Sequence, residues 1–251
     1  MSDVVSGSMI GSSAEFSIGG VFSRTFSILG RNFAPFALIS AVATLPYVLF
    51  YWNQTAAVPG ALPKFNIDMA LPFIVGFVLK MLIQAVIVYA AFQDMRRRPV
   101  AIGESFGKAL PRLAPILGLM IVEGLAVGFG TILLIVPGII LMMMWYVALP
   151  VCVVEQLGPI ESLGRSSELT KGHRWKLFGL VLIVGIVGLI IGATIPIAGR
   201  LIFGRVGFVI TQYLVQTVVG AFGAILVIVI YHDLRVAKEG IDTDQIAAVF
   251  D

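Results

Sequence analysis

The sequence predicts an all-α polytopic membrane protein, and three observations support this fold class. The 251 residues are 59% hydrophobic and 12% charged, and their mean hydropathy is +1.01. The chain also holds six mostly apolar stretches of about 20 residues, the length that an α-helix needs to cross a bilayer. Lysine and arginine collect in alternate connecting segments, as the positive-inside rule describes. We therefore expect six transmembrane helices arranged as three hairpins, each preceded by a short interfacial amphipathic helix.

The composition does not fit other classes of protein. A soluble domain is about a quarter charged, and the 17 basic and 14 acidic residues here are too few to cover a water-exposed surface. This argues against a soluble enzyme, a disordered regulator and a nucleic-acid binder. A single cysteine, Cys152, leaves no disulfide framework. The long apolar runs do not alternate in polarity, so a transmembrane barrel is also disfavoured.

The six expected spans follow in chain order. The first two cover residues 33–52 and 69–92. The next two share residues 113–154, which is too long for one span, and Pro137-Gly138 inside it is a turn signal. We divide this stretch into spans at residues 113–136 and 138–154. The last two spans cover residues 177–197 and 206–231.

The distribution of basic residues sets the orientation. With both termini on one side, that side collects thirteen of the 17: Arg24, Arg31, Arg96, Arg97, Arg98, Lys108, Arg112, Arg165, Lys171, Arg174, Lys176, Arg235 and Lys238. The other side holds three, namely Lys64, Arg200 and Arg205. We expect both termini to be cytoplasmic.

Three segments on the cytoplasmic side share a pattern, in which an apolar residue is followed two positions later by a base. The pairs are Phe22 and Arg24, Phe106 and Lys108, and Leu163 and Arg165. The apolar positions keep to one helix face, which predicts amphipathic helices. This divides the chain into three repeats, residues 15–98, 99–157 and 158–235, between a flexible N-terminus (1–14) and an acidic tail (236–251). The alternative is that any cytoplasmic loop of a membrane protein is amphipathic and basic.

Residues 136–183 carry a resemblance to a known family. The matching positions are Pro137-Gly138, Trp145, Pro150, Glu155, Gly158, Glu161-Ser162, Arg165-Ser166, Thr170-Lys171-Gly172 and Trp175. In these the chain resembles the membrane domain of bacterial glycerophosphoryl diester phosphodiesterases, including stand-alone relatives. The chain departs from the pattern at Met144, where that family often has a base, and at Ser167, where it often has tryptophan. The resemblance implies an integral protein of the bacterial cytoplasmic (inner) membrane. It implies no phosphodiesterase activity, because that chemistry belongs to a separate soluble domain.

Two charges fall inside the expected spans. Lys80 and Glu123 each lie roughly 15–20 Å from the cytoplasmic end of their span at 1.5 Å per residue. A charge at mid-membrane costs at least about 2.5–3.5 kcal/mol, so it marks a functional hypothesis. We expect these residues to form a structural ion pair. The alternatives are a polar path lined by Lys80, Gln84 and Glu123, and two charges that reach the interface independently.

Other features suggest contacts with lipid or protein. Gly185, Gly188 and Gly192 form a small-residue face on the fifth span, expected to pack against another helix in the chain, with a homo-oligomer or partner interface as the alternative. Arg96, Arg97 and Arg98 are expected to contact anionic lipid headgroups, or to act as a topogenic signal alone. The sequence shows no catalytic or metal-binding motif, and we expect no cofactor and no nucleic-acid partner.

These features favour a non-catalytic membrane protein that organises lipid, or that binds and stabilises a membrane partner complex. The alternative is a transporter or channel that uses Lys80, Gln84 and Glu123. Transporters commonly show repeats and broken helices near the bilayer midplane.

Overall fold

The computed structural model describes residues 16–55 and 67–240, and the described residues are all-helical, without strands. The predicted flexible N-terminus (1–14), most of the loop between the first two spans, and residues 241–251 of the acidic tail lie outside them. The elements are α1 (Ile18–Arg31), α2 (Phe33–Thr55), α3 (Ile67–Met95), α4 (Ile102–Ala109), the 3₁₀ turn η1 (Leu110–Arg112), α5 (Leu113–Leu133), α6 (Ile135–Trp145), α7 (Ala148–Pro150), the π-turn η2 (Val151–Glu155), α8 (Pro159–Thr170) and α9 (Arg174–Glu239).

Several helices are long and apolar enough to cross a membrane. In the described part of the chain four pass on length and composition, and a fifth passes if α1 and the start of α2, bent by 89° at Asn32, count as one span. The class predicted from the sequence, a helical protein suited to a membrane, is therefore confirmed. The three expected amphipathic segments are also helical. They are α1, α4 and α8, which precede α2, α5 and α9 respectively.

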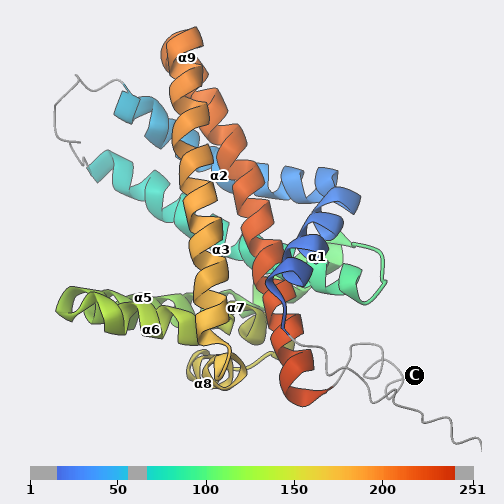
Figure 1. The fold of residues 1–251 in the computed structure, drawn as a ribbon. Coiled ribbons are helices and arrows are strands. Elements are labelled where there is room, and N and C mark those ends of the chain that lie inside the picture. Colours follow the sequence, from blue (N-terminus) through green and yellow to red (C-terminus); the bar gives the residue numbers. More distant parts are fainter. Residues whose placement is uncertain (1–15, 56–66, 241–251) are drawn as a thin grey trace, which may run out of the picture.

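The longest helix, α9, is two helices that fold back on each other. Its backbone leaves helical geometry at Gly204, where φ is 63° and ψ is −146°, a conformation open to glycine. The two arms run side by side after this turn (Figure 1). Gly199 and Gly207 let them approach closely, since a Cβ on Gly199 would lie 2.7 Å from the carbonyl oxygen of Gly207. The observed turn at Gly204 thus falls in the gap between the expected spans at residues 177–197 and 206–231.

A second close pair of helices is formed by α5 and α6. Gly138 packs against α5 so tightly that a Cβ there would lie 2.8 Å from the Cα of Thr131. The chain turns at Leu134, which is extended (φ −155°, ψ 129°). Our expected turn at Pro137-Gly138 was therefore placed too late. Pro137 lies in the first turn of α6, where a missing N–H breaks no helical hydrogen bond.

The helix that α6 begins is broken before it ends. Pro150 has no N–H, and its ring would clash with the carbonyl of Tyr146 in a continuous helix. The chain accordingly turns at residues 146–147 and resumes as α7 and η2. The expected span at residues 138–154 thus consists of three helical pieces, and the segment Ile135–Glu155 that they form is long and apolar enough to cross a membrane.

The arrangement in space is not a parallel bundle. In Figure 1, α5 and α6 run across the direction of α9, while α2 and α3 slant behind it. The core lies where the second half of α3 passes the last third of α9, and its fully buried side chains include Val86, Val88, Ala91, Ile225, Ile228 and Tyr231. α8 lies at the end of the molecule where α9 begins (Figure 1).

Candidate functional site

A cluster of charged side chains joins three elements at the α8 end of the molecule. Arg165 of α8 lies 3.2 Å from a carboxylate oxygen of Glu155 in η2 and also binds Glu239 near the end of α9. Arg235 lies 2.9 Å from the other carboxylate oxygen of Glu239. The Tyr231 hydroxyl donates a 2.8 Å hydrogen bond to Glu155. We call these five residues the α8 ion cluster.

The charges in the α8 ion cluster stabilise one another. Burial alone would raise the pKa of Glu239, but the hydrogen bonds and charges of Arg165 and Arg235 hold that pKa below its ordinary value of 4.5. Burial alone would likewise lower the pKa of Arg165, and its bonds to Glu239 and Glu155 raise it instead. The charges of Glu239 and Arg165 are thereby kept at neutral pH, and the cluster fixes α8 against the ends of two other elements.

Short hydrophilic contacts tie α1 to the same end. Arg24 of α1 binds Asp233 of α9, and the His232 ring lies 3.2 Å from the same carboxylate. At the C-terminal end of α1, Arg31 lies 2.7 Å from Asp94 of α3. The Asn32 amide donates a second bond of 2.8 Å to Asp94. The middle and the C-terminal end of α1 are therefore held by carboxylates from longer helices.

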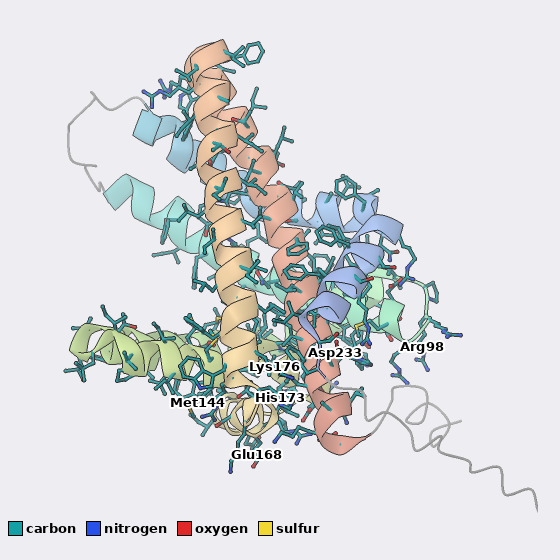
Figure 2. The ribbon with its side chains drawn as sticks, viewed as in Figure 1. Arg98, Met144, Glu168, His173, Lys176 and Asp233 are labelled. Carbon is teal, nitrogen blue, oxygen red and sulfur yellow. The ribbon has the colours of Figure 1, made fainter. Side chains whose placement is uncertain are left out.

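The break in α6 is closed by hydroxyl groups from α8. The Met144 carbonyl loses its helical partner at the turn, and it accepts bonds of 2.9 Å from Ser166 and 3.2 Å from Thr170. Side-chain hydroxyls commonly satisfy backbone groups freed in broken membrane helices. Figure 2 places Met144, Glu168, His173, Lys176, Asp233 and Arg98 toward the half of the molecule that contains α8.

The expected pair of membrane charges does not form. No ion pair between described residues joins Lys80 to Glu123; instead the Lys80 ammonium lies 5.8 Å from the centre of the Tyr47 ring. Two residues at the same depth in the membrane meet only if their helices run side by side. The helices α3 and α5 instead diverge with increasing distance from α4 (Figure 1). Gln84, one turn beyond Lys80, is half-buried on α3.

The small-residue face of α9 also packs differently from our expectation. Added Cβ atoms at Gly185, Gly188 or Gly192 would meet nothing within 4 Å. The expected packing within the chain is therefore wrong, because α9 meets its own second arm nearer the turn, at Gly199 and Gly207. The face looks outward, among exposed side chains such as Leu189.

The three arginines end α3 in a tight hydrogen-bonded turn. The N–H of Arg97 donates to Asp94 and that of Arg98 to Gln93, both at 3.0 Å. Arg97 has the left-handed φ of 57° that this cap requires and that glycine usually supplies. The side chains of Arg97 and Arg98 are exposed, and Arg96 lies against the Phe92 ring.

The charged groups at the α8 end are bound to one another. The carboxylates of Glu155, Asp233 and Glu239 are each bound by an arginine. Within residues 16–55 and 67–240, no group of three or more His, Cys, Asp or Glu side chains could hold a metal ion. The sequence did not lead us to predict the α8 ion cluster, although Glu155 and Arg165 belong to the motif within residues 136–183. Ser166 and Thr170 belong to the same motif. Their clustering in one motif was the signal that could have located it.

The described fold therefore defines a helical protein with membrane-length apolar helices and an ion-paired end. Comparisons with protein-family models, with curated proteins and with solved structures find no match.

Proposed function

We propose that this chain is a non-catalytic integral protein of a bacterial cytoplasmic membrane that organises lipid, or binds and stabilises a membrane partner complex. Its six apolar segments enter the membrane from the cytoplasmic side as three hairpins, with α1, α4 and α8 lying in the interface and both termini in the cytoplasm. The ratio of thirteen basic residues to three supports this orientation. The resemblance of residues 136–183 to a bacterial membrane domain supports the same class.

The observation that carries the proposal is the outward face of the first arm of α9. Its exposed large apolar side chains include Leu182, Ile183, Ile186, Val187, Leu189 and Ile190. Gly185 and Gly192 lie among them with no packing partner in the described part of the chain. A surface of this kind suits lipid chains or a closely approaching helix. The three arginines from Arg96 to Arg98 would add contacts with anionic headgroups.

Extraction of the native protein with its surrounding lipid, followed by mass spectrometry of bound proteins and lipids, tests this proposal. The expected result is reproducible enrichment of a membrane protein or of a lipid class over bulk membrane. A chain that is recovered alone, with bulk lipid composition, would contradict it. Substrate-dependent uptake into vesicles, lost in Lys80→Met, would instead favour transport.

A matched pair of variants locates the contact. Gly185→Leu combined with Gly192→Leu fills the small-residue face without meeting other parts of the chain at the Cβ position. We expect it to reduce enrichment of a protein partner several-fold. Ala193→Leu, one position along and also exposed, adds one leucine beside the small-residue face and should leave enrichment unchanged.

A further inference from the structure

The tip of the α5–α6 hairpin has no charged side chain to hold it in water. Between Gly124 and Met144 the one polar side chain is that of Thr131, whose hydroxyl donates 2.7 Å to the backbone of its own helix. The turn exposes five consecutive large apolar residues, Ile132, Leu133, Leu134, Ile135 and Val136, each at least 65% exposed. Pro137 further reduces the backbone donors at the start of α6. Transfer of these apolar side chains from water to hydrocarbon is favourable, and the backbone N–H of Leu134 at the turn donates to the Gly130 carbonyl at 3.0 Å.

The tip of the α9 hairpin is built differently. Arg200 and Arg205 flank the turn at Gly204. The Arg205 guanidinium stacks 3.9 Å from the centre of the Trp52 ring and donates to the Trp52 carbonyl oxygen. Arginine and tryptophan together are typical of a membrane–water interface. The end of α2 and the turn of the α9 hairpin therefore lie at the same membrane–water interface.

The contacts along α9 give the direction in which the chain crosses the membrane. Ser40 donates to the Thr217 carbonyl at 2.7 Å, and Tyr213 donates to that of Ala41 at 3.1 Å, so α2 lies antiparallel along the second arm. The near end carries the ion pair of Asp233 with Arg24. From Arg205 to Asp233 the arm rises about 42 Å at 1.5 Å per residue, close to the roughly 40–45 Å of a bilayer with its headgroups.

The α5–α6 hairpin leaves this axis near its cytoplasmic end. Gly118 of α5 approaches Pro159 at the start of α8, and the hairpin runs across the first arm of α9 at the α8 end of the molecule (Figure 1). A hairpin in this direction cannot run along the same bilayer normal as α9.

We propose that α5 and α6 form a re-entrant hairpin that lies among the acyl chains of the cytoplasmic leaflet and does not cross the membrane. This inference rests on the membrane embedding proposed above and refines it, because the middle hairpin then occupies one leaflet alone. Lipid chains of that leaflet cover its exposed apolar side chains. The hairpin returns to the side it came from, so the orientation of both termini is unchanged.

Depth-dependent fluorescence quenching tests the inference. Single cysteines are placed at Leu125 or Ile132 on α5, and at Ile190 or Ile202 on α9, in a Cys152→Ser background; all four positions are exposed. Each is labelled with a small fluorophore, reconstituted, and quenched by lipids brominated near the headgroup or near the chain end. Within a membrane-crossing helix the α5 positions would differ in depth by about 10 Å and the α9 positions by about 18 Å.

The expected result is the same quenching profile at Leu125 and Ile132, and clearly different profiles at Ile190 and Ile202. Profiles that differ on α5 as they do on α9 would overturn the re-entrant hairpin and leave the membrane embedding intact. Equal profiles at the two α9 positions would contradict the proposed crossing by α9, and the inference would fail with it.

Discussion

Arg97 places a large side chain where the end of α3 requires a left-handed backbone conformation. This conformation costs a non-glycine residue about 1 kcal/mol or more. Arg97→Gly keeps the two capping hydrogen bonds and removes that cost. We expect the variant to gain about 0.5–1 kcal/mol in the free energy of unfolding, measured by titration of detergent-solubilised protein with denaturing detergent.

Arg97→Ala is the control for this prediction. It removes the same charge as Arg97→Gly but keeps a Cβ in the left-handed conformation. If the alanine variant gains as much stability as the glycine variant, charge repulsion among Arg96, Arg97 and Arg98 is the cause and the strain argument is wrong.

Gly207 controls the closeness of the two arms of α9. A Cβ there would lie 2.6 Å from that of Phe203 and would press on the Gly199 carbonyl. We expect Gly207→Ala to lower the free energy of unfolding by about 1–3 kcal/mol, as overpacking does. Gly185→Ala is the matched control, because its added methyl group meets nothing; thermal unfolding in detergent compares the two. Equal effects would mean that the arms do not rely on this contact.

At the scale of elements, apolar length and amphipathic pattern made most helices predictable. The expected starts of the first and third spans, residues 33 and 113, are the observed starts of α2 and α5. The predicted turn at Pro137 was wrong because proline is also tolerated in a first helical turn. The break in α6 was missed although Pro150 marks it in the sequence, and the hydroxyl groups that satisfy the freed Met144 carbonyl come from α8, beyond the span.

The α8 ion cluster makes the attachment of α8 dependent on pH. The pKa of Glu239 is lowered in the folded protein, so its carboxylate contributes stability above its ordinary value of 4.5, and this contribution is lost as pH falls through the lower folded value. We expect the melting temperature in detergent to be constant from neutral pH to about 5 and to fall below about 4.5.

The variant Glu239→Gln separates this carboxylate from the others. It should melt lower than the unsubstituted protein at neutral pH, because Arg165 and Arg235 lose their shared partner. The difference between the two proteins should shrink as the pH falls below 4. A difference that stays constant down to pH 3 would show that Glu239 does not act through its charge.

At the scale of the whole molecule, helix orientation decides which distant residues meet. Arg24 and Asp233 are 209 positions apart, and Arg165 and Glu239 are 74 apart, so no local pattern indicates either pair. Depth along a span was the available guide for Lys80 and Glu123, and it assumes parallel helices. The separation of α3 and α5 away from α4 breaks that assumption (Figure 1).

The separation of Lys80 from Glu123 predicts how substitutions of the two residues combine. Lys80→Met and Glu123→Gln each remove a charge that has no ion-pair partner among the described residues. Sites without a shared contact usually add within about 0.3–0.5 kcal/mol. We therefore expect the double variant to change the free energy of unfolding by the sum of the single changes, measured in the same detergent for all four proteins.

Tyr47→Leu combined with Lys80→Met is the positive control, since the Lys80 ammonium lies near the Tyr47 ring. Coupling above about 1 kcal/mol between Lys80 and Glu123 would mean that the charges meet in the membrane, and that α3 and α5 run closer to parallel there.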